Sequence, residues 1–373
     1  MVASTGRAVA LLDASEGILL WNATLPNNVT EVRTSEDGRY IAVTHGSTLS
    51  VFDREDGALL CSYDAGYTIR HNALDITRDG KHVAVGCGIS DGANIGYVYV
   101  FNSANGTLLW SYDFGDAVRS LRFSGDGKYI AIGGEHSHYM KLATETGDIL
   151  WSVSCGDPYI SLAISYHGEY ISTGHGWRNY IRLYDRNGTL LWVSTVEGMQ
   201  LSMAMTDNGE YFVSGSSHHT YGSYTGVLFY STASNIPLWR YNTAEDVKSV
   251  DMSTDGSYIV AGCYDDTIYL FGNSSNSPLW TYTTDGDIEE VSISYDGRYL
   301  AAGSKDGRLY VFSLECPKKV ALDIGGDGSV EWVHAGTLRY DATIDDENTA
   351  PKFSSQLQAY IDSHRERGTS TMP

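Results

Sequence analysis

One nine-residue pattern recurs along this 373-residue chain, and it constrains the fold more than any other feature of the sequence. Each copy has a turn built on Asp-Gly or a close variant, then an aromatic residue or His, then an apolar run. The seven copies are SEDGRYIAV from residue 35, TRDGKHVAV from 77, SGDGKYIAI from 124, SYHGEYIST from 165, TDNGEYFVS from 206, STDGSYIVA from 253 and SYDGRYLAA from 294. Their spacing of 41 to 47 residues is typical of a unit of four short strands, and the 3.6-residue period of helical repeats is absent.

Within each repeat the apolar residues alternate as they do in strands that are half buried. VKSVDMS, with Val247, Val250 and Met252 as its apolar members, is an example of the first strand. The turn leads to strands of the types YIVAG and TIYLF, and a hairpin then leads to a fourth strand that bears Leu-Trp. The large residues of the fourth strands are Trp21, Trp110, Trp151, Trp192, Trp239 and Trp280, with Cys61 in that place once. We expect these rings to pack between neighbouring sheets.

The repeat resembles the WD-repeat pattern, with Phe52-Asp53 and Tyr184-Asp185 where the Trp-Asp pair belongs. It is also similar to the PQQ-like repeats of quinoprotein propellers, whose pattern A-x-D-x-T-G-x-x-x-W is nearly met by ATETGDILW, Ala143 to Trp151. The two resemblances cover about residues 7 to 315 and imply a β-propeller, a ring of four-stranded blades. The Gly-His pair of WD repeats is missing, and no two cysteines are adjacent, as the vicinal disulfide of a quinoprotein dehydrogenase would require.

The sequence therefore predicts an all-β fold, a seven-bladed β-propeller of four-stranded antiparallel blades over residues 1–315. We expect GILLWNAT, residues 17–24, to close the ring as the fourth strand of the last blade. An eight-bladed ring is the alternative. In it KKVALDI, residues 318–324, completes the seventh blade, while SVEWVHAG and TLRYDATI add two strands to the N-terminal pair.

Residues 316–373 are expected to form a C-terminal extension with short strands and one helix. VALDIGGDGSVEW resembles a sequence that opens an accessory module of secreted surface proteins of archaea and bacteria. An amphipathic helix is predicted after Pro351, with an apolar face of Phe353, Leu357, Tyr360 and Ile361. DIGGDGSVE also echoes a calcium loop, with Asp323, Asp327 and Glu331 as weak candidate ligands. Because two ligand positions hold Gly325 and His334, we expect a plain turn and no cofactor, with Ca²⁺ as the alternative.

Composition excludes several classes of function. The 40 glycines and 27 tyrosines, with charged residues at 19%, are typical of a strand-and-turn protein. A net charge of −21 argues against a nucleic-acid partner, because phosphate binding needs Lys and Arg. No apolar run is long enough for a transmembrane segment, and MVASTGRAVALL lacks the pattern of a signal peptide. Five cysteines without CxxC spacing indicate buried thiols.

Candidate binding residues gather in the loops between strands two and three and between strand four and the next strand one, which form the top face of a propeller. The long loops at 86–97 and 214–227 stand out, together with the loop at 174–180. The candidates are His136, His138, His175, Trp177, His218, His219, Tyr221, Tyr224, Asp116, Asp246 and Asp287. Imidazole and carboxylate together suit a transition metal, but solvated polar loops are the competing interpretation.

Five Asn-x-Ser/Thr sequons make glycosylation candidates of Asn22, Asn28, Asn105, Asn187 and Asn273. Three of them, Asn105, Asn187 and Asn273, fall in hairpins between strands three and four, on the bottom rim. Sugars there would leave the top face clear. The competing interpretation is that Asn-Gly is simply favourable hairpin chemistry.

No catalytic motif is recognisable, so we expect a non-enzymatic binding or scaffold propeller that recognises a protein or glycan through its top face. The resemblance of the tail indicates an exported or cell-surface protein, with the cytoplasm as the alternative. A propeller hydrolase or lactonase with a top-face metal is the second hypothesis. An intracellular WD-type scaffold is the third.

Overall fold

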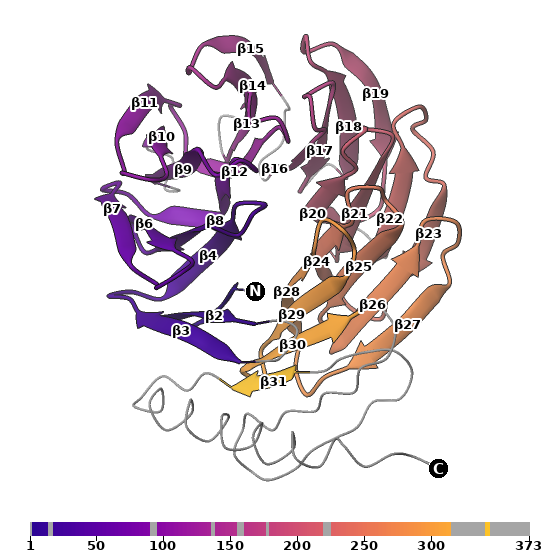
Figure 1. Ribbon diagram of the computed structural model, residues 1–373. Coiled ribbons are helices and arrows are strands. Elements are labelled where there is room, and N and C mark those ends of the chain that lie inside the picture. Colours follow the sequence, from indigo (N-terminus) through magenta and orange to yellow (C-terminus); the bar gives the residue numbers. More distant parts are fainter. Residues whose placement is uncertain are drawn as a thin grey trace, which may run out of the picture.

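The computed structural model describes residues 2–13, 18–89, 95–135, 139–154, 160–176, 179–218, 225–314 and 340–343. All regular elements in these ranges are strands, and they form antiparallel sheets arranged around a central axis (Figure 1). No described element is a helix with the length and apolar character needed to cross a bilayer.

Seven of the sheets are four-stranded blades, in which the strands follow one another in chain order from the axis outward. Blades 1 to 3 comprise β4 (Val29–Thr34), β5 (Tyr40–His45), β6 (Thr48–Asp53) and β7 (Leu59–Asp64); β8 (Ile69–Ile76), β9 (His82–Ile89), β10 (Ile95–Asn102) and β11 (Leu108–Asp113); and β12 (Val118–Phe123), β13 (Tyr129–Gly134), β14 (Tyr139–Thr144) and β15 (Ile149–Ser154). Blades 4 and 5 comprise β16 (Ile160–Ile164), β17 (Tyr170–His175), β18 (Tyr180–Asp185) and β19 (Leu190–Thr195); and β20 (Met199–Met205), β21 (Tyr211–Ser217), β22 (Gly226–Ser231) and β23 (Trp239–Asn242). Blades 6 and 7 comprise β24 (Val247–Met252), β25 (Tyr258–Cys263), β26 (Thr267–Gly272) and β27 (Pro278–Thr283); and β28 (Ile288–Ile293), β29 (Tyr299–Ser304), β30 (Arg308–Ser313) and β31 (Tyr340–Thr343). The predicted seven-bladed ring is confirmed.

The recurring turn explains why each repeat folds the same way locally. In blade 1 Ser35 Oγ donates a hydrogen bond to Asp37 Oδ1 at 2.6 Å and accepts one from the backbone of Tyr40 at 3.1 Å. Gly38 has a φ of 67°, a left-handed conformation that glycine adopts without steric cost. The same Ser-to-Asp bond recurs in the turns of blades 3, 6 and 7. One short motif therefore connects strand one to strand two around the ring.

Neighbouring blades are joined by the fourth-strand tryptophans, as predicted. Trp110 Nε1 donates to the carbonyl of Glu145 in the hairpin of the next blade, at 2.8 Å. A Cβ placed on Gly147 of that hairpin would lie 2.9 Å from the Trp110 ring, so only glycine allows the ring to pack there. Trp151 packs in the same way on Gly188. In blade 1 the smaller Cys61 packs against Gly106.

The N-terminal strands correct the predicted closure of the ring. The described part of the predicted closing strand, residues 18–24, does not pair with the last blade. Its β3 (Leu19–Thr24) pairs with β2 (Ala8–Leu12), which pairs with β1 (Val2–Thr5). This three-stranded sheet packs its apolar face on blade 1, and Figure 1 shows it between blades 1 and 7. The outer edge of β30 is occupied by β31, so no edge is free there for β3.

The structure also corrects the strand assignment of the eight-bladed alternative. Residues 340–343, which the eight-bladed alternative gave to the N-terminal sheet, form the fourth strand of blade 7 instead. The remaining residues of the predicted extension, including those of the amphipathic helix, lie outside the described residues. Among the described cysteines Cys61, Cys87 and Cys263 are free thiols, and Cys87 and Cys263 are buried.

Candidate functional site

The structure describes only part of the predicted top face. His136, His138, Trp177, His219, Tyr221 and Tyr224 lie outside the described residues, as do the calcium candidates Asp323, Asp327 and Glu331. Two of the predicted loops are also shorter than expected. Strands β9 and β10 extend into 86–97, and β21 and β22 extend into 214–227, so the loops between them are 90–94 and 218–225.

Two of the candidates are buried and cannot meet a partner at the surface. His175 is the last residue of β17 and is 0% exposed, with Nε2 at 3.0 Å from Thr173 Oγ1. Burial, together with the positive charge of Arg182, lowers the pKa of His175 to about 3, so the imidazole is neutral. Asp116 is 1% exposed, and its carboxylate accepts a hydrogen bond from the backbone of Ala117 at 2.8 Å. The sequence pattern placed both residues in loops. Asp116 does lie in the loop between β11 and β12, whereas His175 belongs to β17, and packing encloses both side chains.

The other three candidates lie on the top face of blades 5 to 7. Asp246 accepts a hydrogen bond from the backbone of His218 at 2.6 Å, and His218 Nδ1 lies 3.4 Å from the same oxygen. Asp287 pairs with Lys305 at 2.8 Å. Hydrogen bonds to Asp287 and Glu289 raise the pKa of Lys305, which stays charged. The structure thus gathers acidic groups on this sector but does not bring Asp246 and Asp287 into one ion pair network.

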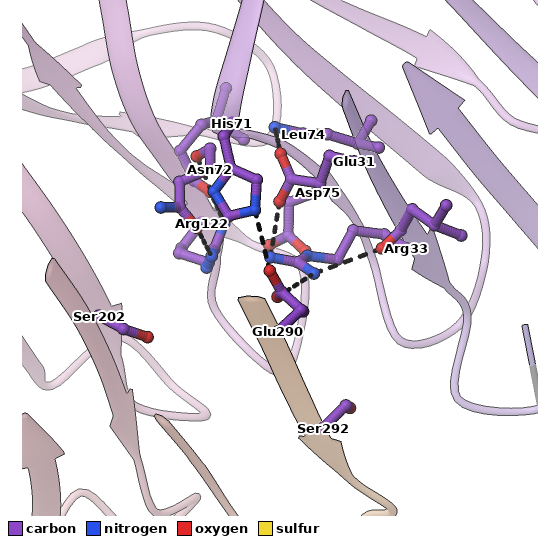
Figure 2. Close-up of polar contacts among 12 residues, drawn as sticks. Glu31, Arg33, His71, Asn72, Leu74, Asp75, Arg122, Ser202, Glu290 and Ser292 are labelled. Carbon is purple, nitrogen blue, oxygen red and sulfur yellow. Dashed lines mark hydrogen bonds and ion pairs between the residues drawn. The ribbon is translucent and has the colours of Figure 1, made fainter. Parts of the chain in front are cut away.

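Another group of interacting charges lies on the first strands of blades 1, 2 and 7, which surround the central channel of the ring (Figure 2). Glu290 of β28 accepts a hydrogen bond from His71 of β8 at 2.9 Å and lies 3.8 Å from Arg33 of β4. Arg33 also pairs with Glu31 at 2.6 Å. Figure 2 shows His71 and Arg33 reaching Glu290 from different blades. This cluster therefore connects blades 1, 2 and 7 across the channel.

An irregularity in strand one of blade 2 directs His71 into the channel. The pairing of β8 with β9 shifts between Ile69 and Leu74, and Asn72 has a left-handed φ of 68°. Arg122 of β12 donates to Asn72 Oδ1 at 3.2 Å and so supports the irregular backbone. His71 is therefore placed beside Glu290 by an irregular strand, and not by a loop.

The charges of the cluster stabilise one another. Burial raises the pKa of Glu290, but the hydrogen bond from His71 and the positive charges of His71 and Arg33 outweigh it and lower that pKa to about 2. Burial lowers the pKa of His71, but the bond and charge of Glu290 outweigh it and raise that pKa above the usual value. For Arg33, burial is likewise outweighed by Glu31 and Glu290, so its pKa is raised. Glu290 and Arg33 are thus ionised at neutral pH.

Other carboxylates of the channel bind the backbone of the next blade. Asp75 Oδ2 accepts the N–H of Phe123 at 2.7 Å, and Asp251 Oδ2 accepts that of Ile293 at 3.0 Å. Glu31 Oε2 accepts the N–H of Leu74 at 3.2 Å. Burial raises the pKa of Asp75 and of Asp251. These acids hold the first strands of successive blades together.

The recurring turns of several blades also contact one another at the bottom of the ring. Arg78 in the turn of blade 2 makes a bidentate pair with Asp207 in the turn of blade 5, one bond of which is 2.7 Å long. The guanidinium lies over the rings of Tyr166 and Tyr295, 5.2 and 4.6 Å from their centroids. Backbone hydrogen bonds also join turns of neighbouring blades, including Tyr166 to Asp207 at 3.0 Å. These contacts link the bottom turns of blades 2, 4, 5 and 7.

Sequence reasoning missed the channel residues because it searched the loops. One signal was present: Glu31, Arg33, Asp75, Arg122 and Glu290 are charged at strand-one positions where other blades have Ser or Ala. No group of three or more His, Cys, Asp or Glu side chains that could hold a metal ion occurs among the residues that the structure describes.

The blades and the docking tryptophans define a β-propeller. The chain belongs to the PQQ-like repeat family whose model carries the description "Outer membrane protein assembly factor BamB", which matches residues 1–95 and 94–216, more than half of the chain. A second model, "WD domain, G-beta repeat", matches residues 237–271 and 276–313. The search of curated proteins gave no match.

Proposed function

We propose that this propeller is a non-enzymatic binding or scaffold module that recognises a protein partner through the top face of its ring. The observation that carries the proposal is that the charged groups of the channel and of the bottom turns are already bonded within the protein. The channel charges are paired with one another, and the bottom turns are linked by the Arg78–Asp207 pair and its tyrosines. The top loops differ from blade to blade, and recognition residues usually lie on such loops above a rigid scaffold.

The charge of the top face favours a basic partner. On blades 6 and 7 the described top loops and adjoining strand ends carry the acids Glu245, Asp246, Asp265, Asp266, Asp285, Asp287, Glu289 and Asp306, against Lys248, Lys305 and Arg308. Complementary charge steers association and selects among partners. A protein segment rich in Lys or Arg is therefore the partner that this sector fits best.

We also propose that the protein acts outside the cell or at its surface. Support comes from the sequence of residues 320–332, which resembles a module of secreted surface proteins, and from the description of the matching family model, which names an outer-membrane factor. The cytoplasm is the alternative.

Charge reversal on the top face tests the proposed function. Asp246→Lys and Asp287→Lys are compared with Glu55→Lys, an exposed acid in a bottom hairpin whose side chain makes no ion pair among the described residues. Each protein is immobilised, and proteins retained from native extract are quantified by mass spectrometry. A partner should be retained by the native chain and by Glu55→Lys, and its recovery should fall about tenfold or more with either top-face variant, as expected for a lost interfacial charge pair.

Equal recovery with all three variants, at unchanged melting temperatures, would place binding on another surface. A glycan partner would be indicated if the same variants instead lost retention on immobilised cell-surface polysaccharide while protein recovery stayed unchanged.

A further inference from the structure

Three sequon asparagines occupy hairpins between strands three and four of alternate blades. Asn105 lies in blade 2, Asn187 in blade 4 and Asn273 in blade 6, and all three are exposed. Each begins an Asn-x-Ser/Thr acceptor, Asn105-Gly-Thr, Asn187-Gly-Thr and Asn273-Ser-Ser. The three positions are therefore spaced around the bottom rim of the ring, with one blade between each and the next.

The hairpin backbone does not require asparagine at these positions. The residue before the hairpin glycine is Asp56 in blade 1 and Thr146 in blade 3, where blades 2 and 4 have asparagine. The described non-glycine residues with positive φ are Asn72, Asn179 and Asp266, so none of the three sequon asparagines adopts the left-handed conformation that favours this residue. Aspartate and threonine thus serve the same hairpin position, so the turn does not by itself select asparagine.

Two other asparagines in similar hairpins use the amide nitrogen to bind a neighbouring blade. Asn235 Nδ2 donates to Val193 of the preceding blade at 3.1 Å, and Asn276 Nδ2 donates to Arg240 at 3.0 Å. Neither of these residues begins a sequon. Within the described ranges Asn105 uses only Oδ1, which accepts from Thr107 at 3.0 Å. The amide of Asn187 donates to the carboxylate of Asp185 in its own hairpin. Within the described residues, neither side chain therefore bonds to a neighbouring blade.

We propose that Asn105, Asn187 and Asn273 are N-glycosylation sites, and that their glycans cover the bottom rim of the propeller. The inference rests on the proposed location outside the cell. In the transfer, Nδ2 bonds to the anomeric carbon of a sugar carried on a polyprenyl phosphate lipid. The carbon–oxygen bond to phosphate breaks, the lipid phosphate leaves, and the amide proton passes to a base of the transferase. Glycans at these three hairpins lie at the opposite end of the blades from the top loops.

The test is secretion of the full chain, with an added signal peptide and an appended C-terminal sequon, from an N-glycosylating host. Site occupancy is measured by glycopeptide mass spectrometry. We expect all three hairpins to be occupied. Thr107→Ala, which keeps Asn105 but destroys its sequon, should abolish occupancy at Asn105 alone, and Thr107→Ser should restore it.

The appended sequon makes a negative result decisive. Unoccupied hairpins on molecules whose appended sequon carries a glycan would overturn the proposal, whatever the partner experiment shows. Binding through the top face is read from charge-reversal variants, so the two proposals fail separately.

Discussion

At the scale of single residues, the channel shows how charges that resemble a catalytic site can be structural. His71, Arg33 and Glu290 converge from three blades, but each of them lies in an ion pair with a residue of opposite charge. A catalytic acid or base would need a proton to exchange with a substrate near its working pH. Here Glu290 has a pKa of about 2 and Arg33 a raised one, so both stay charged. Of the three groups, the imidazole of His71 is the one whose ordinary pKa is near neutrality, and Glu290 raises that pKa.

Stability should therefore depend on pH through His71. Since its pKa is raised by Glu290, the contribution of the charged imidazole is fully present below about pH 6.5 and is lost as pH rises through the folded-state value. His71 and Glu290 are 44% and 41% exposed, so solvent screening limits the effect to under about 1 kcal/mol. His71→Gln should flatten the decline of melting temperature between pH 6 and 9, whereas His82→Gln on β9 should not. An unchanged slope in His71→Gln would show that the contact with Glu290 contributes nothing.

At the scale of elements, the unit of stability is a tryptophan of one blade packed on a hairpin glycine of the next. Gly147 and Gly307 have nearly the same positive φ, 91° and 84°. A Cβ on Gly147 meets the Trp110 ring at 2.9 Å, whereas one on Gly307 has nothing within 4 Å. Gly307→Ala should cost about 1–2 kcal/mol for the backbone alone, and Gly147→Ala about 1–3 kcal/mol more. Urea unfolding of both variants measures the difference, and equal costs would mean that the ring moves aside freely.

The repeat predicted the strands and turns well because each is specified locally. The Ser-x-Asp-Gly turn and the alternation of buried residues such as Val250 and Met252 define strand positions without knowledge of the rest of the chain. The pairing of the N-terminal strands could not be found this way, because β3 has the same sequence pattern as every fourth strand. Its partner depends on which strand pairs with the outer edge of the last blade, and that edge is taken by β31. The bond between His71 and Glu290 joins residues 219 positions apart, through a bulge that no local pattern announces.

At the scale of the whole molecule, two kinds of contact hold the ring. Tryptophans and apolar clusters join each described blade to its neighbour, while a few polar contacts join blades that are not neighbours. The Arg78–Asp207 pair belongs to the second kind, since it connects blades 2 and 5 and lies against tyrosines of blades 4 and 7. Such a contact requires that blades 2 to 5 are assembled, so it reports on cooperativity between blades.

Breaking that pair should weaken the ring as a unit. Arg78 and Asp207 are 20% and 33% exposed, so removing one partner leaves a partly buried charge without its bidentate hydrogen bonds. Asp207→Ala and Arg78→Ala should each cost about 1.5–3 kcal/mol of unfolding free energy, and the double variant little more than either alone. Lys81→Ala, which removes an exposed pair with Asp79 in the same turn, is the control and should change stability by less than about 1 kcal/mol. Urea unfolding of the four proteins gives the coupling energy directly. Additive costs in the double variant would mean that the two residues act through their own turns and not as a connection across the ring.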